Sequence, residues 1–183
     1  KVLALLKQYQ AHATFFVVGT RVKEGAEVLK QEVAQECEIG NHTWDHANLA
    51  KLSMKKVNMQ YDKTADLVKK LVGYDITLLR PPYGAISAKM RKKLKHPMVL
   101  WNTDTLDWKS KNTKAIMKEI KKNVKDGDII LMHDIHPTTV EALKKVLPWL
   151  VKNDYDILTV SELAKRKGAV MHDGKAYGGF TGN

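Results

Sequence analysis

The stretch Glu38-Ile39-Gly40-Asn41-His42-Thr43-Trp44-Asp45-His46 places two histidines directly after a short segment that predicts a strand and a turn. On one turn of helix the His42 and His46 side chains would lie one above the other, because residues four apart share a helix face. Two imidazole nitrogens at that spacing can reach one Zn²⁺, for which Zn–N bonds are about 2.0–2.1 Å. Histidines at this spacing are also found by coincidence, so the interpretation requires other polar groups that converge on them.

The composition is that of a folded protein with a basic surface. The 183 residues favour one domain, and a hydrophobic fraction of 44% argues against disorder. No apolar run approaches the roughly 20 residues that a membrane helix needs, and the single cysteine, Cys37, excludes an internal disulfide. The net charge of +11 suggests an anionic partner. The lysines are dispersed over amphipathic patterns such as 114–125, and no nucleic-acid-binding motif accompanies them, so an anionic polymer such as a bacterial cell wall fits as well.

Helical and strand patterns alternate along the chain. Helical patterns cover residues 2–10, 22–36, 54–72, 87–95, 113–124, 139–152 and 161–167. Strand patterns cover residues 13–18, 38–41, 76–79, 98–101, 129–132 and 157–160. Helices between buried strands indicate parallel β-α-β units, which favours a small irregular β/α barrel, with an open doubly wound sheet as the alternative. The tail from Gly168 reads as an irregular hairpin or a loose end.

Polar residues follow several of the predicted strands. Arg80-Pro81-Pro82-Tyr83-Gly84 follows 76–79, Asn102 to Trp108 follows 98–101, and His133 to His136 follows 129–132. Each segment alone could be a turn, a helix start or a buried histidine. Catalytic residues of β/α barrels lie at the carboxyl ends of the strands, so these three segments and the segment 42–46 after the strand at 38–41 together indicate an active site.

These motifs resemble those of the polysaccharide deacetylases of the NodB-homology type, carbohydrate esterase family 4. The resemblance runs from about Val2 to Lys165 and rests on five motifs in order. They are Ala-Thr-Phe-Phe at 13–16, His-Thr-x-x-His at 42–46, Arg-Pro-Pro-Tyr-Gly at 80–84, Asp-Thr-Leu-Asp-Trp at 104–108 and Leu-Met-His at 131–133. The stretches 104–108 and 133–136 look similar to the peptidoglycan N-acetylglucosamine deacetylases of Gram-positive bacteria. The resemblance implies a distorted (β/α) barrel and a metal-dependent removal of acetyl groups from N-acetylated sugars.

The resemblance also implies the metal site and the groups that stabilise the oxyanion. His42 and His46 would hold a divalent ion, with zinc preferred and cobalt or another divalent ion as the alternative. The backbone N–H of Tyr83 would help to stabilise the oxyanion. Arg80 would position a carboxylate.

The resemblance places the general acid and its supporting residues in the motifs at 104–108 and 131–133. By resemblance His133 is the general acid that protonates the sugar nitrogen, and Asp107 would orient its ring and favour its charged form. Trp108 and Leu131 would wall a pocket for the acetyl methyl group. His136 and Asp45 are interpreted as structural, and His12 as a weak addition to the acid side.

One family motif is absent from this sequence. The family's Thr-Phe-Asp-Asp-Gly motif, which supplies the catalytic base and a carboxylate ligand, should lie shortly before Val2. We expect residues 1–167 to be a deacetylase domain without its first strand, followed by a tail at 168–183. The missing segment would precede Lys1 or bind as a separate peptide; the alternative is a defective homologue.

The predicted function is metal-dependent hydrolysis of the N-acetyl group of N-acetylglucosamine residues in a polysaccharide, with peptidoglycan preferred. Chitin oligosaccharides and O-acetylated xylan are alternative substrates. A non-catalytic carbohydrate-binding homologue is the competing class, and a nucleic-acid binder explains only the charge. The expected partners are an N-acetylated glycan and an anionic cell wall, with no nucleic acid. The expected location is extracellular or at the cell surface of a Gram-positive bacterium.

Overall fold

The computed structural model of the chain describes residues 1–181, and the last two residues of the tail lie outside that range. These residues separate into two compact units. Unit 1 comprises 1–13, 101–169 and the residues from Gly178 on, and unit 2 comprises 14–100 and 170–177. None of the helices described between residues 1 and 181 combines the length and the apolar character that a membrane crossing requires. The expected catalytic domain at 1–167 stays a prediction.

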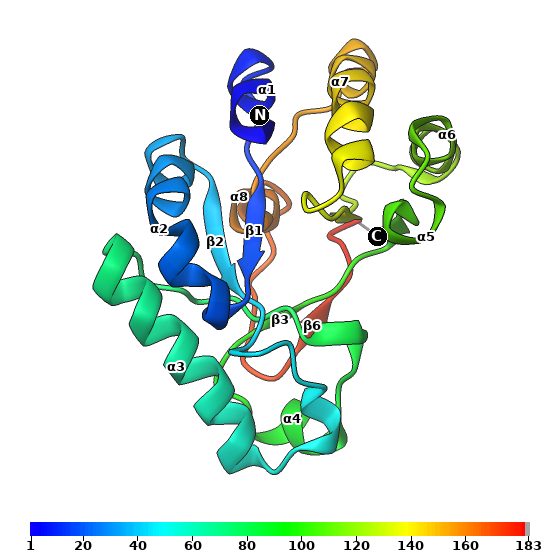
Figure 1. Cartoon of the computed structure of the whole chain (residues 1–183). Helices are drawn as coiled ribbons and strands as arrows, with labels where there is room; N and C mark the ends of the chain where they lie inside the picture. The colour runs from blue at the N-terminus through cyan, green and yellow to red at the C-terminus, as the bar shows by residue number, and fades with distance from the viewer. Residues whose placement is uncertain (182–183) are drawn as a thin grey trace. The chain divides into compact units, whose positions relative to one another are not determined.

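Unit 2 is built on parallel strand pairing (Figure 1). Strand β1 (Thr14–Val17) pairs in parallel with β2 (Glu38–Asn41), and helix α2 (Gly19–Ala34) connects them. Single parallel bridges at Leu79 join β2 to β3 (Met98–Val99), so the strand expected at 76–79 is reduced to one bridging residue. The Pro-Pro sequence explains its end, because proline removes the N–H that a ladder needs.

Helices pack against this sheet through their apolar faces, which share a hydrophobic core with its strands. Helix α3 (Met54–Val72) packs against α2, and its buried Val57, Tyr61 and Val68 join a core with Leu79. The predicted ends of α3 are confirmed: the Ser53 hydroxyl accepts from Lys56 N–H, and Gly73 closes the helix in the left-handed conformation. The shorter elements of unit 2 are η1 (Leu49–Lys51), η2 (Pro82–Gly84) and α4 (Ala88–Lys93), which Ser87 caps as expected.

The described part of the tail contains a strand, and its interpretation as a hairpin or a loose end is wrong for these residues. Residues Ala176–Tyr177 form β6, which pairs in parallel with β3. Within unit 1, Phe180 is buried, and its N–H donates to the Gly127 carbonyl at 2.7 Å. The glycines of this segment therefore allow close backbone packing.

Unit 1 consists of helices around a short parallel pair. Strands β4 (Thr103–Asp104) and β5 (Ile130–Leu131) pair in parallel. Strand β5 lies within the strand expected at 129–132 and is shorter than predicted, whereas β4 was not predicted and lies in the polar segment expected after 98–101. The helices are α1 (Val2–Gln8), α5 (Asp107–Ser110), α6 (Thr113–Asn123), α7 (Pro137–Lys152) and α8 (Val160–Arg166). Helices α6 and α7 pack together over buried Ile116, Ile120 and Val146.

The strand predicted at 157–160 is wrong. Thr159 instead caps α8: its hydroxyl accepts from Glu162 N–H, and the Glu162 carboxylate accepts from Thr159 N–H. This reciprocal capping box satisfies the backbone groups at the helix start, so α8 begins at Val160 where the apolar pattern indicated a strand.

Substitution of Gly127 tests how the tail docks. Gly127 has φ +89, and a Cβ there would lie 2.6 Å from the Phe180 carbonyl oxygen. Gly168 has φ +64 with no atom within 4 Å of such a Cβ, which makes it the matched control. The left-handed conformation alone costs roughly 1–2 kcal/mol, so Gly168→Ala should lower the free energy of unfolding by about that amount. Gly127→Ala should cost about 1–3 kcal/mol more because of the clash, as measured by urea unfolding. Equal losses in the two variants would contradict the close packing of Phe180.

Candidate active site

The two histidines of the first motif lie in an irregular loop after β2. The imidazole rings of His42 and His46 have centroids 4.9 Å apart in an edge-on arrangement. Thr43 and His46 have φ of +70° and +63°, so the helical turn assumed for the pair is wrong. The reason lies at the start of α2, where the N–H groups of Gly19 and Thr20 donate to the Thr43 and Trp44 carbonyls. The loop carbonyls thus serve α2 instead of a helix of their own.

Two buried amide side chains hold this loop by accepting hydrogen bonds from its backbone. The Asn41 Oδ1 accepts from Thr43 N–H at 2.8 Å, and the Gln60 Oε1 accepts from Trp44 N–H at 2.8 Å. Sequence reasoning missed Gln60, because a glutamine on α3 reads as part of a solvated helix face. The two amides fix the loop that carries the histidines.

The chemistry of the His42 ring fits a metal ligand. Its Nδ1 lies 2.6 Å from the Arg80 carbonyl oxygen, which can only accept, so Nδ1 carries the hydrogen and Nε2 carries the lone pair. A histidine that ligates a metal usually donates its other N–H in this way. Within residues 1–181, however, no group of three or more His, Cys, Asp or Glu side chains could hold a metal ion. The described chain therefore offers two imidazoles toward such a site.

The Arg80-Pro81-Pro82-Tyr83-Gly84 motif brings an exposed aromatic ring to the same loop. The Tyr83 ring is 70% exposed and lies edge-on to His46 at 5.0 Å between centroids. Tyr83 has φ +62, and within residues 1–181 its N–H donates to no other backbone group. An N–H without a backbone acceptor meets one condition for the predicted oxyanion contact, which stays a prediction.

The Arg80 side chain is buried under this motif. Its guanidinium donates to the Leu100 carbonyl at 3.1 Å and lies 4.2 Å from the centre of the Phe16 ring. Burial lowers the pKa of Arg80 to about 10, which leaves the group cationic at neutral pH. These contacts anchor the strand end, and the expectation that Arg80 positions a carboxylate stays a prediction.

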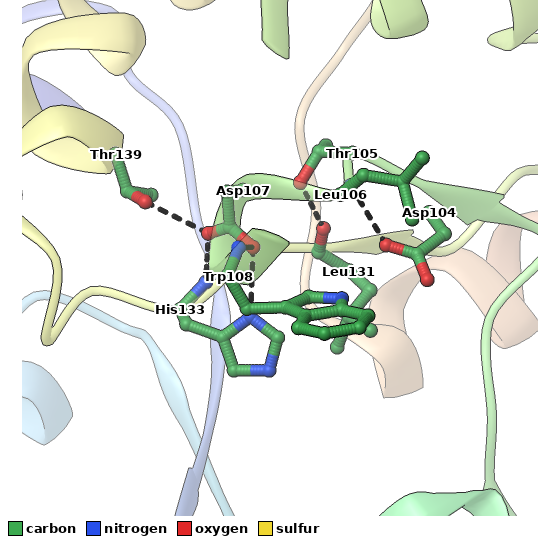
Figure 2. A network of polar contacts seen from close by, with 8 residues as sticks. All are labelled: Asp104, Thr105, Leu106, Asp107, Trp108, Leu131, His133 and Thr139. Atoms are coloured by element: carbon green, nitrogen blue, oxygen red, sulfur yellow. Dashed lines mark hydrogen bonds and ion pairs between the residues drawn. The ribbon is translucent and has the colours of Figure 1, made fainter. Parts of the chain in front are cut away.

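In unit 1 the Asp107 carboxylate binds His133 through both of its oxygens (Figure 2). Oδ1 accepts from the His133 ring Nδ1 at 2.8 Å and from Trp108 N–H at 2.8 Å. Oδ2 accepts from His133 N–H at 2.6 Å and from the Thr139 hydroxyl at 2.8 Å. Asp107 is fully buried, whereas the His133 side chain is 36% exposed. The ring nitrogen Nε2 points away from the carboxylate (Figure 2), so it can face a ligand.

Two opposing effects set the charge of Asp107. Burial raises its pKa, but the hydrogen bonds from the His133 ring, the His133 N–H and the Thr139 hydroxyl outweigh burial and lower the pKa below its ordinary value. The carboxylate therefore stays ionised at neutral pH. A carboxylate can only accept, so the His133 Nδ1 carries a hydrogen and the ring orientation is fixed.

The predicted walls of the acetyl pocket flank this pair. Trp108 is 50% exposed, while Leu131 is buried on β5 and its carbonyl accepts from the Thr105 hydroxyl at 2.8 Å. Leu106, with φ +51, turns the chain between β4 and α5, and its N–H donates to the Asp104 carboxylate. This turn presents the indole beside a buried acid, and the role of Trp108 and Leu131 in substrate binding stays a prediction.

Three other polar residues of unit 1 are Thr139, His136 and His12. Thr139 was missed, because a threonine at a helix start reads as a cap, and only the fold brings its hydroxyl to Asp107. His136 is the N-cap residue of α7, and its interpretation as a structural residue stays a prediction. His12 pairs with Glu162 at 2.9 Å, a carboxylate that also caps α8.

The family model of polysaccharide deacetylases, described as "Polysaccharide deacetylase", matches residues 1–98, which is more than half of the chain. The chain belongs to this family. The peptidoglycan-N-acetylmuramic acid deacetylase PdaC of Bacillus subtilis is 40% identical over 91% of this chain and 36% of the relative. A peptidoglycan-N-acetylglucosamine deacetylase of Bacillus cereus is 38% identical over 91% of this chain and 82% of the relative. The chain thus spans little more than a third of the length of the first of these relatives.

Several solved structures have the same fold as this chain. The T48 deacetylase with substrate superposes with a TM-score of 0.91 at 35% identity, covering 96% of this chain and 87% of the other. An acetyl xylan esterase of Clostridium thermocellum in complex with a cobalt ion gives 0.91 at 30% identity, covering 97% and 90%. A mutant of a family 4 pseudoenzyme gives 0.81 at 28% identity, covering 88% and 60%. The predicted α/β class, the distorted barrel of the NodB-homology type, is confirmed by this likeness.

The Asp107 network should make stability depend on pH in the acid range. Because the pKa of Asp107 is lowered by folding, its contribution is present above the unfolded-state value of about 3.9 and is lost as the pH falls through the folded-state value. Asp107→Asn should cost about 1–3 kcal/mol at pH 7, since it leaves buried donors unsatisfied. The difference between wild type and variant in urea unfolding should shrink as the pH falls below the unfolded-state value of about 3.9, because the folded-state pKa lies below that value. A difference that stays constant over this range would contradict an ionised, hydrogen-bonded Asp107.

Proposed function

We propose that this chain is the deacetylase part of an enzyme that hydrolyses the N-acetyl group of N-acetylglucosamine residues in peptidoglycan. The observation that carries the proposal is the pairing of His133 with the buried, ionised Asp107. A buried carboxylate with four hydrogen bonds is a rigid support for an imidazole, and this arrangement suits proton transfer at the opposite nitrogen. A histidine with only a structural role needs neither the partial exposure nor the outward Nε2.

In the proposed reaction His133 acts as the general acid. Its Nδ1–H stays on Asp107, and its Nε2–H gives a proton to the sugar nitrogen as the amide C–N bond breaks. The products are acetate and a free amine on the sugar. General acid catalysis of this kind contributes typically 10²–10⁴-fold in rate, which sets the size of effect expected from removing the ring.

His42 and His46 would hold the divalent metal that the family implies. When bound, such an ion supplies Lewis-acid polarisation of a carbonyl and an activated water. The tautomer of His42, fixed by the Arg80 carbonyl, suits this role. We infer zinc, because paired imidazoles are common zinc ligands; cobalt is the ion in the Clostridium thermocellum esterase structure. We place the carboxylate ligand and the base on a Thr-Phe-Asp-Asp-Gly segment that this sequence does not contain.

The remaining motif residues would orient the acetyl group. The Tyr83 N–H, which donates to no other backbone group in residues 1–181, is the proposed donor to the oxyanion; one such donor is commonly worth about 2.7–4 kcal/mol. The half-exposed Trp108 and the buried Leu131 would contact the acetyl methyl group. Arg80 would stabilise the Tyr83 turn through the strand ends that it binds.

The names of the relatives support peptidoglycan as the polymer. The relatives from Bacillus subtilis and Bacillus cereus are described as peptidoglycan deacetylases, one for N-acetylmuramic acid and one for N-acetylglucosamine. We propose N-acetylglucosamine, with N-acetylmuramic acid as the alternative that the product sugar distinguishes. Peptidoglycan lies outside the cell membrane, so we also propose an extracellular or cell-surface location in a Gram-positive bacterium.

A non-catalytic carbohydrate-binding homologue is the second candidate. It is favoured by the lack of a three-ligand group within residues 1–181 and by the likeness to a family 4 pseudoenzyme. The two candidates differ in one measurement, the release of acetate from an N-acetylated glycan.

Loss of the imidazole pair should remove the metal. Equilibration with zinc followed by dialysis and elemental analysis should give about one equivalent for the wild-type protein that includes the proposed Thr-Phe-Asp-Asp-Gly segment, and less than a tenth of that for the His42→Ala, His46→Ala double variant. The exposed His172 provides the matched control, since His172→Ala also removes an imidazole from unit 2. Retention of the metal in the double variant would exclude these histidines as ligands.

Loss of the His133 ring should affect turnover and not metal content. In the protein that includes the proposed Thr-Phe-Asp-Asp-Gly segment, His133→Ala should lower kcat for acetate release from a chito-oligosaccharide by roughly 10²–10⁴, with metal content and KM close to wild type. His172→Ala again serves as the control and should leave kcat unchanged. If His133→Ala loses the metal, His133 is a ligand; if kcat falls less than threefold, it is not the acid.

A further inference from the structure

Five lysines line a shallow hollow of about 550 Å³ on the outer side of α6 and α7 in unit 1. Four come from α6 and one from α7; they are Lys114, Lys118, Lys121, Lys122 and Lys145. Met117 adds an apolar patch to the lining. Helices α6 and α7 pack together within the unit (Figure 1), so these side chains have fixed backbone positions. We call this surface the lysine hollow.

The lysines of the hollow lack the ion pairs that other lysines have. Within residues 1–181 none of the five forms a salt bridge with a carboxylate, and Lys121 lies 5.9 Å from the centre of the Trp149 ring. The neighbouring Lys144, by contrast, pairs with Glu141 at 2.7 Å. The one acid on α6, Glu119, accepts instead from Asn123 at 3.0 Å. The hydrogen bond from Lys144 and the nearby charge of Lys145 help to lower the pKa of the Glu141 carboxyl group, so the hollow presents an excess of positive charge that lies mainly on the four lysines of α6.

The spacing along α6 concentrates that charge in a row. Lys114, Lys118 and Lys122 follow one another at intervals of four residues, which is about 6 Å along a helix axis. Like charges at this spacing destabilise a helix. A bound polyanion would remove this repulsion and would be held by several ammonium groups at once.

We propose that the lysine hollow binds a phosphodiester polymer of the bacterial cell wall. Lysine ammonium groups bind phosphates as point charges without fixed geometry, which suits a flexible chain. The lining has no aromatic, Arg, Asn or Gln side chain of the kinds that stack on or read nucleobases, so nucleic acid is disfavoured. The choice of a wall polymer rests on the proposed function, which brings the chain to peptidoglycan. The hollow would then hold the enzyme on the wall through a surface other than its catalytic residues.

The test compares two variants of equal charge. In the first, Lys114, Lys118 and Lys122 are replaced by glutamine; in the control, the exposed Lys92, Lys93 and Lys152 are replaced by glutamine. Glutamine has nearly the helix propensity of lysine, so both variants should fold. Calorimetric titration with poly(glycerol phosphate) is carried out between about 50 and 200 mM salt. We expect Kd to rise at least about tenfold in the first variant and less than twofold in the control. The dependence of log K on log salt should become shallower by about two in the first variant, since about 0.7 is lost for each phosphate contact of a flexible strand.

Three results would overturn the proposal. Equal weakening of poly(glycerol phosphate) binding in the two variants would show that binding depends on net charge alone. If the wild-type chain does not bind this polymer, the proposed partner is excluded. Duplex DNA that binds as tightly, with the same loss in the first variant, would make the hollow a nucleic-acid surface. Acetate release from a neutral chito-oligosaccharide is measured in parallel and should be equal in all three proteins. Failure of the proposed function would appear as absent turnover in the wild type, whereas failure of the lysine hollow would appear as a lost difference between the variants.

Discussion

The buried Asp107 carboxylate is the constraint around which unit 1 is arranged. It accepts four hydrogen bonds from three residues, Trp108, His133 and Thr139. These residues belong to three different segments of the chain. Two donors belong to His133, which follows β5, and a third is Thr139 in the first turn of α7. A charge without these partners would be too costly to bury, so the α5 start, the end of β5 and the α7 start must meet. The geometry proposed for catalysis is thus also a condition of folding.

The loop of unit 2 that carries His42 and His46 is also held by buried hydrogen-bond acceptors, but these are neutral amide groups instead of a carboxylate. Asn41 and Gln60 are buried, and their carbonyl oxygens accept from the backbone of the loop, while the start of α2 donates to its carbonyls. The Arg80 carbonyl then sets the His42 ring. In each unit a histidine is held by acceptors on the protein side, which leaves its other nitrogen directed away from them. This arrangement suits His42 as a proposed metal ligand and His133 as a proposed proton donor.

The sequence predicted the elements whose signals are local. Ser53 and Gly73 mark the ends of α3 because capping depends on adjacent backbone groups, and the motif residues stood after predicted strands because β/α folds keep polar side chains there. Gln60 and Thr139 could not be found in this way, since their partners lie 16 and 32 residues away in the chain. The strand expected at 157–160 failed because an apolar run of four residues does not distinguish a strand from a helix start, and the Thr159 capping box decided between them.

Side-chain hydrogen bonds also explain how such short strands hold the polar residues in place. Strands β4 and β5 have two residues each, too few for a stable ladder by themselves. The Asn102 Oδ1 accepts from Ile129 N–H at 2.9 Å, and the Thr103 hydroxyl donates to Asp128 at 2.8 Å, so side chains extend the pairing at the start of β4 and β5. Beyond the strands, the Thr105 hydroxyl continues it to the Leu131 carbonyl. The pair is therefore locked at both ends, and the residues that follow it, Asp107 and His133, are positioned by polar contacts that the hydrophobic pattern of the sequence does not record.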